Sequence, residues 1–358
     1  MADFLVGLWT IPHAQNWKRA WKVRALDMRK SLERLNGMLR VHAGSLDADG
    51  AFQAIFLAPE YYFTEQSPKG RRLPLNDRDR RNLEDTLLGF SNEFSKILIV
   101  PGSAFYEKPM ERGTDPREQL KFNPATGKRD LPKVQAPDHR RQHVLKQVDT
   151  AIAVAAAGPR QGVITKWSVL ALDGKGGADY KYWDPADQIY AMIPPLALVR
   201  SNIAKEKPRI ARNATYALLG GRRLAKYDKH GDFFEADGKP DEMVFIPGTK
   251  NQCPEIGGFK FGFEICFDHA NATLMKRGVP GLAFHLLVSD YVMTQKGNMA
   301  MDDNGYFLHA STSYAQTSVY HRNEKGALEN FTGDVKYRIT HDGQAGEWLD
   351  FYKLPLPA

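Results

Sequence analysis

Cys266 is one of two cysteines in a chain of 358 residues, and its position suits a thiol that acts as a nucleophile. The apolar side chains of residues 259–265 alternate, which predicts a half-buried strand that runs directly into the cysteine. A lone cysteine can also be a small buried hydrophobic residue, and this is the interpretation that we keep for Cys253. From its strand alone, Cys266 fits either role.

The segment after Cys266 predicts a helix. Asp268 or Asn271 could be its N-cap and Gly278 its C-cap. In a sharp turn between strand and helix, the thiol would face the positive end of the helix, which lowers the pKa of a thiol. Backbone N–H groups of the same turn could bind an oxyanion. This setting is the one that a nucleophile requires.

Glu60 is a candidate general base. It directly follows a continuous apolar strand predicted for residues 54–57. Its neighbours in residues 57–63 are apolar or aromatic, so its carboxylate should be partly desolvated. Desolvation raises the pKa of a carboxyl group toward the range in which a general base works. The alternative is an ordinary loop carboxylate in water.

Lys229 supplies a third group. It lies at the end of the second strand of a predicted hairpin, whose strands cover residues 214–219 and 222–227 and whose turn is Gly220-Gly221. A fixed ammonium could hold a thiolate and stabilise the negative charge that develops on an attacked acyl group. A single lysine at a strand end is usually a surface charge, so the combination with Glu60 and Cys266 is what carries the hypothesis.

Three segments resemble the three motifs of the nitrilase superfamily, in the order of that family. They are Leu57-Ala58-Pro59-Glu60, Lys226-Tyr227-Asp228-Lys229-His230 and Gly262-Phe263-Glu264-Ile265-Cys266-Phe267-Asp268. Supporting matches occur at residues 97–105, 245–248 and 303–308, so the resemblance covers most of the chain except roughly 107–210. The resemblance implies that the Glu-Lys-Cys triad of the family is Glu60, Lys229 and Cys266.

The family often has a second glutamate shortly after the lysine, which assists water or amine. The resemblance makes Glu235 the catalytic candidate for this role, at a tighter spacing than the family suggests, with Asp237 as the fallback. Lys166 stands in a segment that resembles the lysine motif less well. We reject it because the Tyr-Asp-Lys-His context belongs to Lys229.

The resemblance also implies the fold, a four-layer α-β-β-α sandwich of the nitrilase type, and homodimers or higher homo-oligomers formed through helices. The sequence pattern agrees with an α/β class. Residues 4–11 predict a strand, 21–39 an amphipathic helix, and 54–57 and 96–100 two further strands. We expect a single carbon–nitrogen hydrolase domain over residues 1–358, with a long excursion at about 107–210.

The later elements are predicted from shorter patterns. Residues 282–288 read as an apolar strand, and 318–320 and 335–339 as late strands of a second antiparallel set. Residues 303–314 favour a helix at their start, and two strands could lie at 150–157 and 163–172 within the excursion.

Several residues beside the motifs could bind a substrate. The aromatic candidates are Tyr61, Tyr62, Phe233, Phe234, Phe267 and Tyr291. Any of them could equally belong to the core. Asp290, just after a predicted strand, could meet a cationic or amino group of the substrate, or it could cap a helix.

These features favour a cysteine-dependent hydrolase of a non-peptide carbon–nitrogen bond that works through a thioester. Nitrilases proper usually have Trp-Glu after the cysteine, whereas this chain has Phe267-Asp268, so an amide or carbamoyl substrate is favoured over a nitrile. The alternatives are an acyltransferase that forms amides, a true nitrilase on the same triad, and a catalytically silent binding protein of this fold.

Histidines offer two competing interpretations. Any of His230, His269 and His285 could pair with Cys266 as in a cysteine protease, but no Asn or Asp partner signature accompanies them. His139 and His143 are four residues apart, a spacing that suits a metal on one helical face, but no third ligand is near. Without a Walker motif or a dinucleotide-binding glycine-rich turn, we expect neither a metal nor a cofactor.

Composition limits the partners. The net charge is +7, but the densest basic segment, 121–146, contains acids, so a solvated loop is favoured over a nucleic-acid site. The first residues lack a signal peptide, and no apolar run reaches the roughly 18 residues of a membrane helix. We therefore expect a cytoplasmic protein whose partner is a small molecule.

Overall fold

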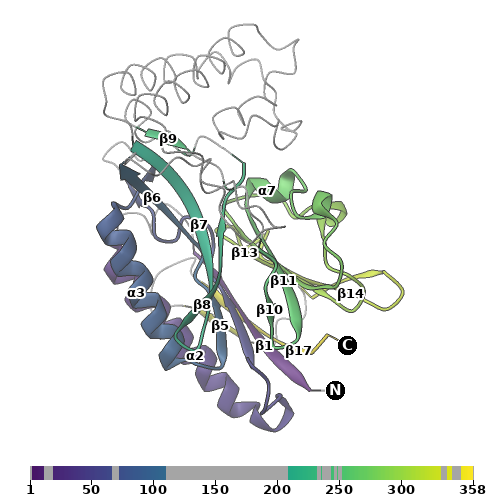
Figure 1. Ribbon diagram of the computed structural model, residues 1–358. Helices are drawn as coiled ribbons and strands as arrows, with labels where there is room; N and C mark the ends of the chain where they lie inside the picture. Colours follow the sequence, from purple (N-terminus) through teal and green to yellow (C-terminus); the bar gives the residue numbers. More distant parts are fainter. Residues whose placement is uncertain are drawn as a thin grey trace, which may run out of the picture.

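The computed structural model describes residues 2–11, 19–66, 72–109, 209–231, 235, 243–245, 248, 252–331, 337–340 and 348–357. It is a mixed α/β structure built around two large sheets (Figure 1). Within the described ranges no helix is both long and apolar enough to cross a membrane.

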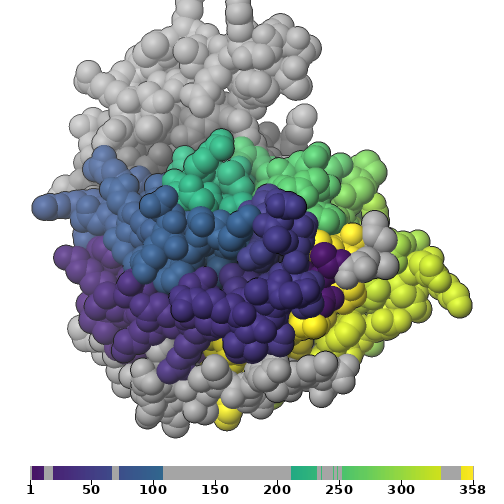
Figure 2. Space-filling view, turned by 90° about the horizontal axis from the view of Figure 1, so that it is seen from below, coloured from purple at the N-terminus to yellow at the C-terminus, as the bar shows by residue number. Residues whose placement is uncertain are grey.

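The first sheet has nine strands. Its order is β16 (Tyr337–Thr340), β17 (Trp348–Pro355), β1 (Asp3–Thr10), β2 (Ala54–Leu57), β5 (Ile97–Val100), β7 (Arg209–Leu219) and β6 (Ser103–Pro109), with β8 (Arg222–Asp228) and β9 (Met243–Phe245) also paired to β7. Strands β1, β2 and β5 are parallel. Because β17 pairs with β1, the N-terminal and C-terminal residues lie side by side, as Figure 2 also shows.

The second sheet has six strands. In order they are β10 (Glu255–Ile256), β11 (Phe259–Ile265), β12 (Leu282–Ser289), β13 (Tyr306–Ser311), β14 (Ser318–Arg322) and β15 (Leu328–Asn330). Strands β11, β12 and β13 are parallel, so their carboxyl ends lie at one edge of the sheet. A separate two-stranded ribbon joins β3 (Glu65–Gln66) and β4 (Arg72–Leu73).

Alternation along the strands divides the core into two layers. In β1, Leu5 and Trp9 face the helices α2 (Trp21–Val41) and α3 (Asp77–Glu93), whereas Phe4, Val6 and Leu8 face the second sheet. The second sheet meets them with the similarly alternating apolar side chains of β11, β12 and β13. Both faces of the first sheet are therefore covered, one by helices and one by the other sheet.

The helices follow from their apolar spacing. In α2, residues Met28, Leu32, Leu35 and Leu39 recur at steps of three and four and are all buried. Helix α3 buries Leu83, Leu87 and Phe90 in the same way, and the side chain of its N-cap, Asn76, accepts a hydrogen bond from the N–H of Asp79 at 2.9 Å. The outer face of the second sheet carries short helical segments instead: α7 (Phe267–Ala270), η4 (Met275–Arg277) and η5 (Lys296–Asn298). A further turn, η1 (Ala43–Ser45), follows α2.

Most predicted elements are confirmed. The strands expected at 4–11, 54–57, 96–100, 259–265, 282–288, 318–320 and 335–339, the helix at 21–39 and the hairpin around Gly220-Gly221 all occur, with shifts of a few residues at their ends. The assignment of 318–320 and 335–339 to one second set of strands is wrong, because β14 lies in the second sheet and β16 pairs with β17 in the first. Helix α3 and strands β6 and β17 were not predicted from the sequence. The strands predicted at 150–157 and 163–172, and nearly all of the excursion, lie outside the described residues.

The helix predicted at the start of 303–314 is wrong, because residues 306–311 form β13. This strand lies between β12 and β14 and is buried on both faces, with Leu308 in the core between the sheets and Phe307 on the outer side. A strand buried on both sides has a continuous apolar sequence without alternation. Such a run resembles a buried helix segment.

Candidate active site

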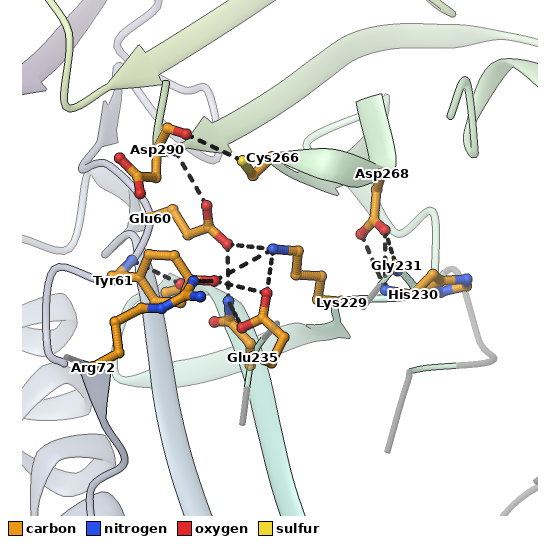
Figure 3. A network of polar contacts seen from close by, with 12 residues as sticks. Glu60, Tyr61, Arg72, Lys229, His230, Gly231, Glu235, Cys266, Asp268 and Asp290 are labelled. Carbon is orange, nitrogen blue, oxygen red and sulfur yellow. Dashed lines mark hydrogen bonds and ion pairs between the residues drawn. The ribbon is translucent and has the colours of Figure 1, made fainter. Parts of the chain in front are cut away.

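Residues from four separate strands converge at one end of the two sheets (Figure 3). Glu60 comes shortly after β2, Lys229 directly after β8, Cys266 directly after β11 and Asp290 directly after β12. The N–H of Glu60 donates to the carbonyl oxygen of Ser289 at 3.3 Å, which joins the edge of the first sheet to that of the second. The structure thus brings the predicted triad together.

Lys229 is the centre of the charges. Its Nζ lies 2.8 Å from Glu60 Oε1 and 2.5 Å from Glu235 Oε1, and all three side chains are buried. Burial alone would lower the pKa of Lys229, but Glu235 and Glu60 outweigh it and hold this pKa well above its usual value. The ammonium therefore stays charged in the interior.

Glu60 has the properties of a base near neutral pH. Burial raises its pKa to about 7; the charge of Lys229 opposes this rise, whereas that of Glu235 adds to it. Oε1 also accepts from Asn213 Nδ2 at 2.9 Å, and Oε2 accepts from the N–H of Asp290 at 3.1 Å. Both oxygens are thus held in place by donors, and the carboxyl group changes protonation in the range that suits general base catalysis.

The backbone at Cys266 has an unusual conformation, with φ 47° and ψ −102°. A residue other than glycine in such a conformation costs of order 1–3 kcal/mol and persists where the surrounding structure enforces it. The thiol is 8% exposed, and Sγ donates to the carbonyl oxygen of Asp290 at 3.3 Å. The same peptide segment at Asp290 thus contacts both the thiol and, through its N–H, the base Glu60.

Two expectations about the cysteine turn are wrong. Burial and the nearby charge of Glu60 raise the pKa of Cys266 well above its usual value, although Lys229 opposes them, so the resting group is a thiol. The helix after it, α7, has only four residues and Cys266 itself is its N-cap, so the helix offers little positive potential. In addition, the N–H of Cys266 donates to Val288 at 2.9 Å and is not available to an oxyanion.

Tyr61 contacts Glu235. Its hydroxyl donates to Glu235 Oε1 at 2.7 Å and accepts from Arg72, whose guanidinium lies 4.6 Å from the centre of the tyrosine ring. Asn213 Nδ2 approaches Glu235 Oε2 at 3.3 Å. Glu235 thus joins the triad, whereas Asp237 lies outside the described residues.

Asp268 holds the segment that carries the lysine. Its carboxylate accepts from Tyr227 Oη at 2.7 Å and from the N–H groups of His230 at 3.1 Å and Gly231 at 2.6 Å. Burial raises the pKa of Asp268 to about 7, with Lys229 opposing. Asp268 therefore contacts the residues on both sides of Lys229 and does not cap a helix. Asn271 is not an N-cap either, whereas Gly278 is confirmed as a C-cap, of η4.

The remaining predicted binding residues are spread more widely. Tyr62 lies in the core on the helix side of the first sheet, where its hydroxyl donates to the carbonyl oxygen of Arg24 at 2.7 Å. Phe267 is buried directly after the cysteine, and Tyr291 is 66% exposed directly after Asp290. Asp290 itself accepts from Thr312 Oγ1 at 2.8 Å through its side chain. Phe233, Phe234, Lys166, His139 and His143 lie outside the described residues.

Sequence reasoning missed Asn213 and Arg72. Asn213 is a buried amide directly before the mostly apolar second half of β7, and an amide in that position is a signal that could have been noticed. Arg72 stands in a short ribbon with no periodic pattern, and nothing in the sequence marks it. The contacts of both residues, with Glu60 and with Tyr61, become visible only in the folded structure.

The protease-like alternative has no support from His269 or His285. Both rings bond to Glu264, at 2.9 Å each, and their second nitrogens accept backbone N–H groups. The ring of His230 stacks on Tyr227 at 5.2 Å. In the described part of the chain, the charges that act most strongly on Cys266 are those of Glu60, Lys229 and Asp290, and no histidine is among them.

The comparisons find similarity in structure only. Neither a family model nor a curated protein matches the chain. Among solved structures, Nit3 of Saccharomyces cerevisiae, a member of branch 10 of the nitrilase superfamily, is 12% identical, with a TM-score of 0.43 over 99% of this chain and 90% of Nit3. An amidase from Nesterenkonia sp. is 9% identical, with a TM-score of 0.43 over 99% and 91% of the two chains. A CN-hydrolase superfamily protein from Xanthomonas campestris is 10% identical, with a TM-score of 0.41 over 99% and 91%. At these identities the likeness concerns the fold alone.

We expect Glu60→Gln to slow alkylation of Cys266 by iodoacetamide about 100-fold at about pH 7.5, because the amide cannot take the thiol proton. In the wild type the rate should rise with pH through about 7, where Glu60 loses its proton and becomes a base, and this rise should be absent in the variant. Peptide mass spectrometry over a pH series measures both cysteines, and Cys253 serves as the internal reference. An unchanged pH profile would show that Glu60 does not serve the thiol.

We expect Tyr61→Phe to move the same rise to higher pH. Without the tyrosine hydroxyl, Glu235 competes more strongly for Lys229, and Glu60 loses part of the charge that opposes the rise of its pKa. The matched control is Tyr62→Phe, which removes a buried hydroxyl from the neighbouring residue on the opposite side of the sheet. Each variant should lose about 1–3 kcal/mol in thermal or urea unfolding, but only Tyr61→Phe should shift the pH profile. A shift in both would assign the effect to general destabilisation.

Proposed function

We propose that this protein is a cysteine hydrolase of a non-peptide carbon–nitrogen bond, in an amide or a carbamoyl compound. The observation that carries the proposal is the buried ammonium of Lys229 between the carboxylates of Glu60 and Glu235, next to the thiol of Cys266 (Figure 3). A thiol with a raised pKa is a weak nucleophile until a base takes its proton, and Glu60 has the pKa and the position of such a base. The motif resemblance supports the same assignment.

In the first half of the reaction, Glu60 takes the proton from Sγ and the sulfur attacks the carbonyl carbon of the substrate. The carbon–oxygen double bond opens, and the ammonium of Lys229 stabilises the oxygen anion. When the anion collapses, the carbon–nitrogen bond breaks, and the protonated Glu60 returns the proton to the leaving amine or ammonia. The product on the enzyme is a thioester of Cys266.

In the second half, a carboxylate takes a proton from water, and the hydroxide attacks the thioester and releases the acid and the thiol. Glu60 can repeat its role as base, and Glu235 fixes the position of Lys229 for both halves through its 2.5 Å contact. Lys229 is the donor that we assign to the charge on the oxygen, and the N–H of Cys266 does not share this role because it is bonded to Val288.

The finer fold assignment belongs to the same proposal. The outer face of the second sheet buries Leu287 and Phe307 with Met299 and Met301, beneath short helical segments. We infer that helical structure completes a fourth layer on this face, so that the chain is a single α-β-β-α sandwich. Glu60 and Cys266 would then lie at the edge of its two inner layers.

A panel of amides, carbamoyl compounds and nitriles, assayed for ammonia release, tests the proposed function. We expect release from an amide or carbamoyl substrate, a loss of about 10⁴-fold or more in Cys266→Ala, and full activity in Cys253→Ala. Intact-mass spectrometry of the wild type should show an acyl adduct that Cys266→Ala lacks.

Other outcomes of the panel identify the alternatives. Equal inactivity of the wild type and Cys266→Ala on every class, without an adduct, would contradict the hydrolase and favour a binding protein. Release from nitriles alone would identify a nitrilase. An amide product in the presence of an added amine would identify an acyltransferase, because the thioester then passes its acyl group to the amine in place of water.

A further inference from the structure

A second buried polar cluster lies on the outer side of the second sheet, next to the cysteine. It consists of Glu264, His269 and His285, none of which is exposed to solvent. Glu264 Oε2 accepts from His269 Nδ1 and from His285 Nε2, each at 2.9 Å, and Oε1 accepts from the N–H of Leu274 at 2.6 Å. One carboxylate therefore joins β11, α7, the start of η4 and β12.

The composition of this cluster suits a metal, but its hydrogen bonds do not. The outward nitrogens accept backbone N–H groups, His269 Nε2 from Gln295 at 3.2 Å and His285 Nδ1 from Ala300 at 3.1 Å. A neutral imidazole that accepts at one nitrogen carries its proton on the other, so both ring protons point at Glu264. A metal on the inner nitrogens would require protons on the outer ones, which would then face N–H donors.

Glu264 is ionised in this arrangement. Burial would raise its pKa, but the attraction of His285 and the bonds from His269 and His285 outweigh burial and lower this pKa to about 2. Burial lowers the pKa of His285, against the attraction of Glu264. The cluster is thus one carboxylate with two neutral rings, and every N–H that points at the carboxylate has an acceptor.

We propose that Glu264, with His269 and His285, is the positioning device that holds the turn of Cys266 in its reactive conformation. The inference rests on the proposed function of Cys266 as the nucleophile. Glu264 stands two residues before the cysteine and His269 three residues after it, so their bond closes the turn from both sides. The left-handed backbone of Cys266 needs such a constraint, because a relaxed turn would be lower in energy.

The cluster also fixes the other side of the thiol. His285 belongs to β12, whose carboxyl end leads into Asp290, the acceptor for Cys266 Sγ. The N–H groups of Gln295 and Ala300, which bond to the two rings, belong to the segment that follows Asp290. One network therefore sets both the direction of Sγ and the position of the peptide that joins Sγ to Glu60.

Glu264→Gln breaks the network with almost no change of shape. The amide has one acceptor oxygen for three N–H donors, and its NH₂ group has to face at least one of them. Each buried donor left without an acceptor costs about 1–3 kcal/mol, which is as large as the cost of the strained backbone. The turn is then free to relax and carry Sγ away from Glu60.

The test is alkylation of both cysteines by iodoacetamide in the full-length protein, measured as a function of pH by peptide mass spectrometry. In Glu264→Gln we expect the Cys266 rate to fall at least about tenfold at about pH 7.5, and its rise through about pH 7 to disappear, while the Cys253 rate stays unchanged. The matched control is Tyr306→Phe, which removes one partly buried hydrogen bond, to Pro355, at the opposite end of the parallel strands. This control should leave the Cys266 profile as in the wild type.

Three results decide the inference. A wild-type Cys266 profile in a folded Glu264→Gln protein would overturn it. The inference would also be overturned if the purified wild type held one equivalent of metal, and if its removal by a chelator slowed the alkylation of Cys266 as much as Glu264→Gln does. If Glu264→Gln does not fold, both cysteines will be alkylated fast, and His285→Gln then replaces it as the test, because glutamine keeps an N–H donor for Glu264. A drop of roughly threefold or more in the alkylation rate of Cys266 in His285→Gln supports the inference, and no drop overturns it. Failure of the proposed function is distinct, since Glu60→Gln would then also leave the Cys266 profile unchanged.

Discussion

The charge of Lys229 is the interaction on which the site depends. Two carboxylates, Glu60 and Glu235, are buried beside it, and each would be costly to bury without a partner. One ammonium cannot neutralise both fully. Of the two, Glu60 is the one whose charge acts on the thiol of Cys266, and burial raises its pKa to about 7. Burial, opposed only in part by Lys229, thus gives Glu60 the pKa that the proposed base requires at neutral pH.

Glu60 and Cys266 come close together because each of the two sheets contributes parallel strands that end at the same edge. Strand β2 delivers Glu60 from the first sheet, and β11 and β12 deliver Cys266 and Asp290 from the second. The bond from the N–H of Glu60 to Ser289 closes the seam between them. Lys229 arrives from the hairpin β7–β8, and Gly248 allows a second segment to approach that end closely, since a side chain there would collide with the carbonyl oxygen of Asp228. The site therefore forms only when both sheets are packed.

The sequence was sufficient for the parts of the site that depend on local pattern. Glu60, Lys229 and Cys266 each follow a recognisable strand, and the apolar alternation of residues 259–265 correctly placed the turn. The direction of the pKa of Cys266 was not predictable in this way, because it depends on burial by residues far away in the chain. The different surroundings of Tyr61 and Tyr62 were not predictable from the sequence either. The hydroxyl of Tyr61 bonds to Glu235, whereas the side chain of Tyr62 packs in the core under α2.

In the proposed function, the reactivity of Cys266 has a different origin from the one that a strand-turn-helix pattern suggests. A four-residue helix cannot supply much positive potential, so the thiol depends on a base, and a base helps only if its distance and direction are fixed. Two carboxylates close to the cysteine in sequence fix them from opposite sides. Asp268 holds the backbone around Lys229, and Glu264 holds the segments before and after the thiol. The relative positions of Cys266, Glu60 and Lys229 therefore depend on two carboxylates whose own bonds go to the surrounding backbone and side chains.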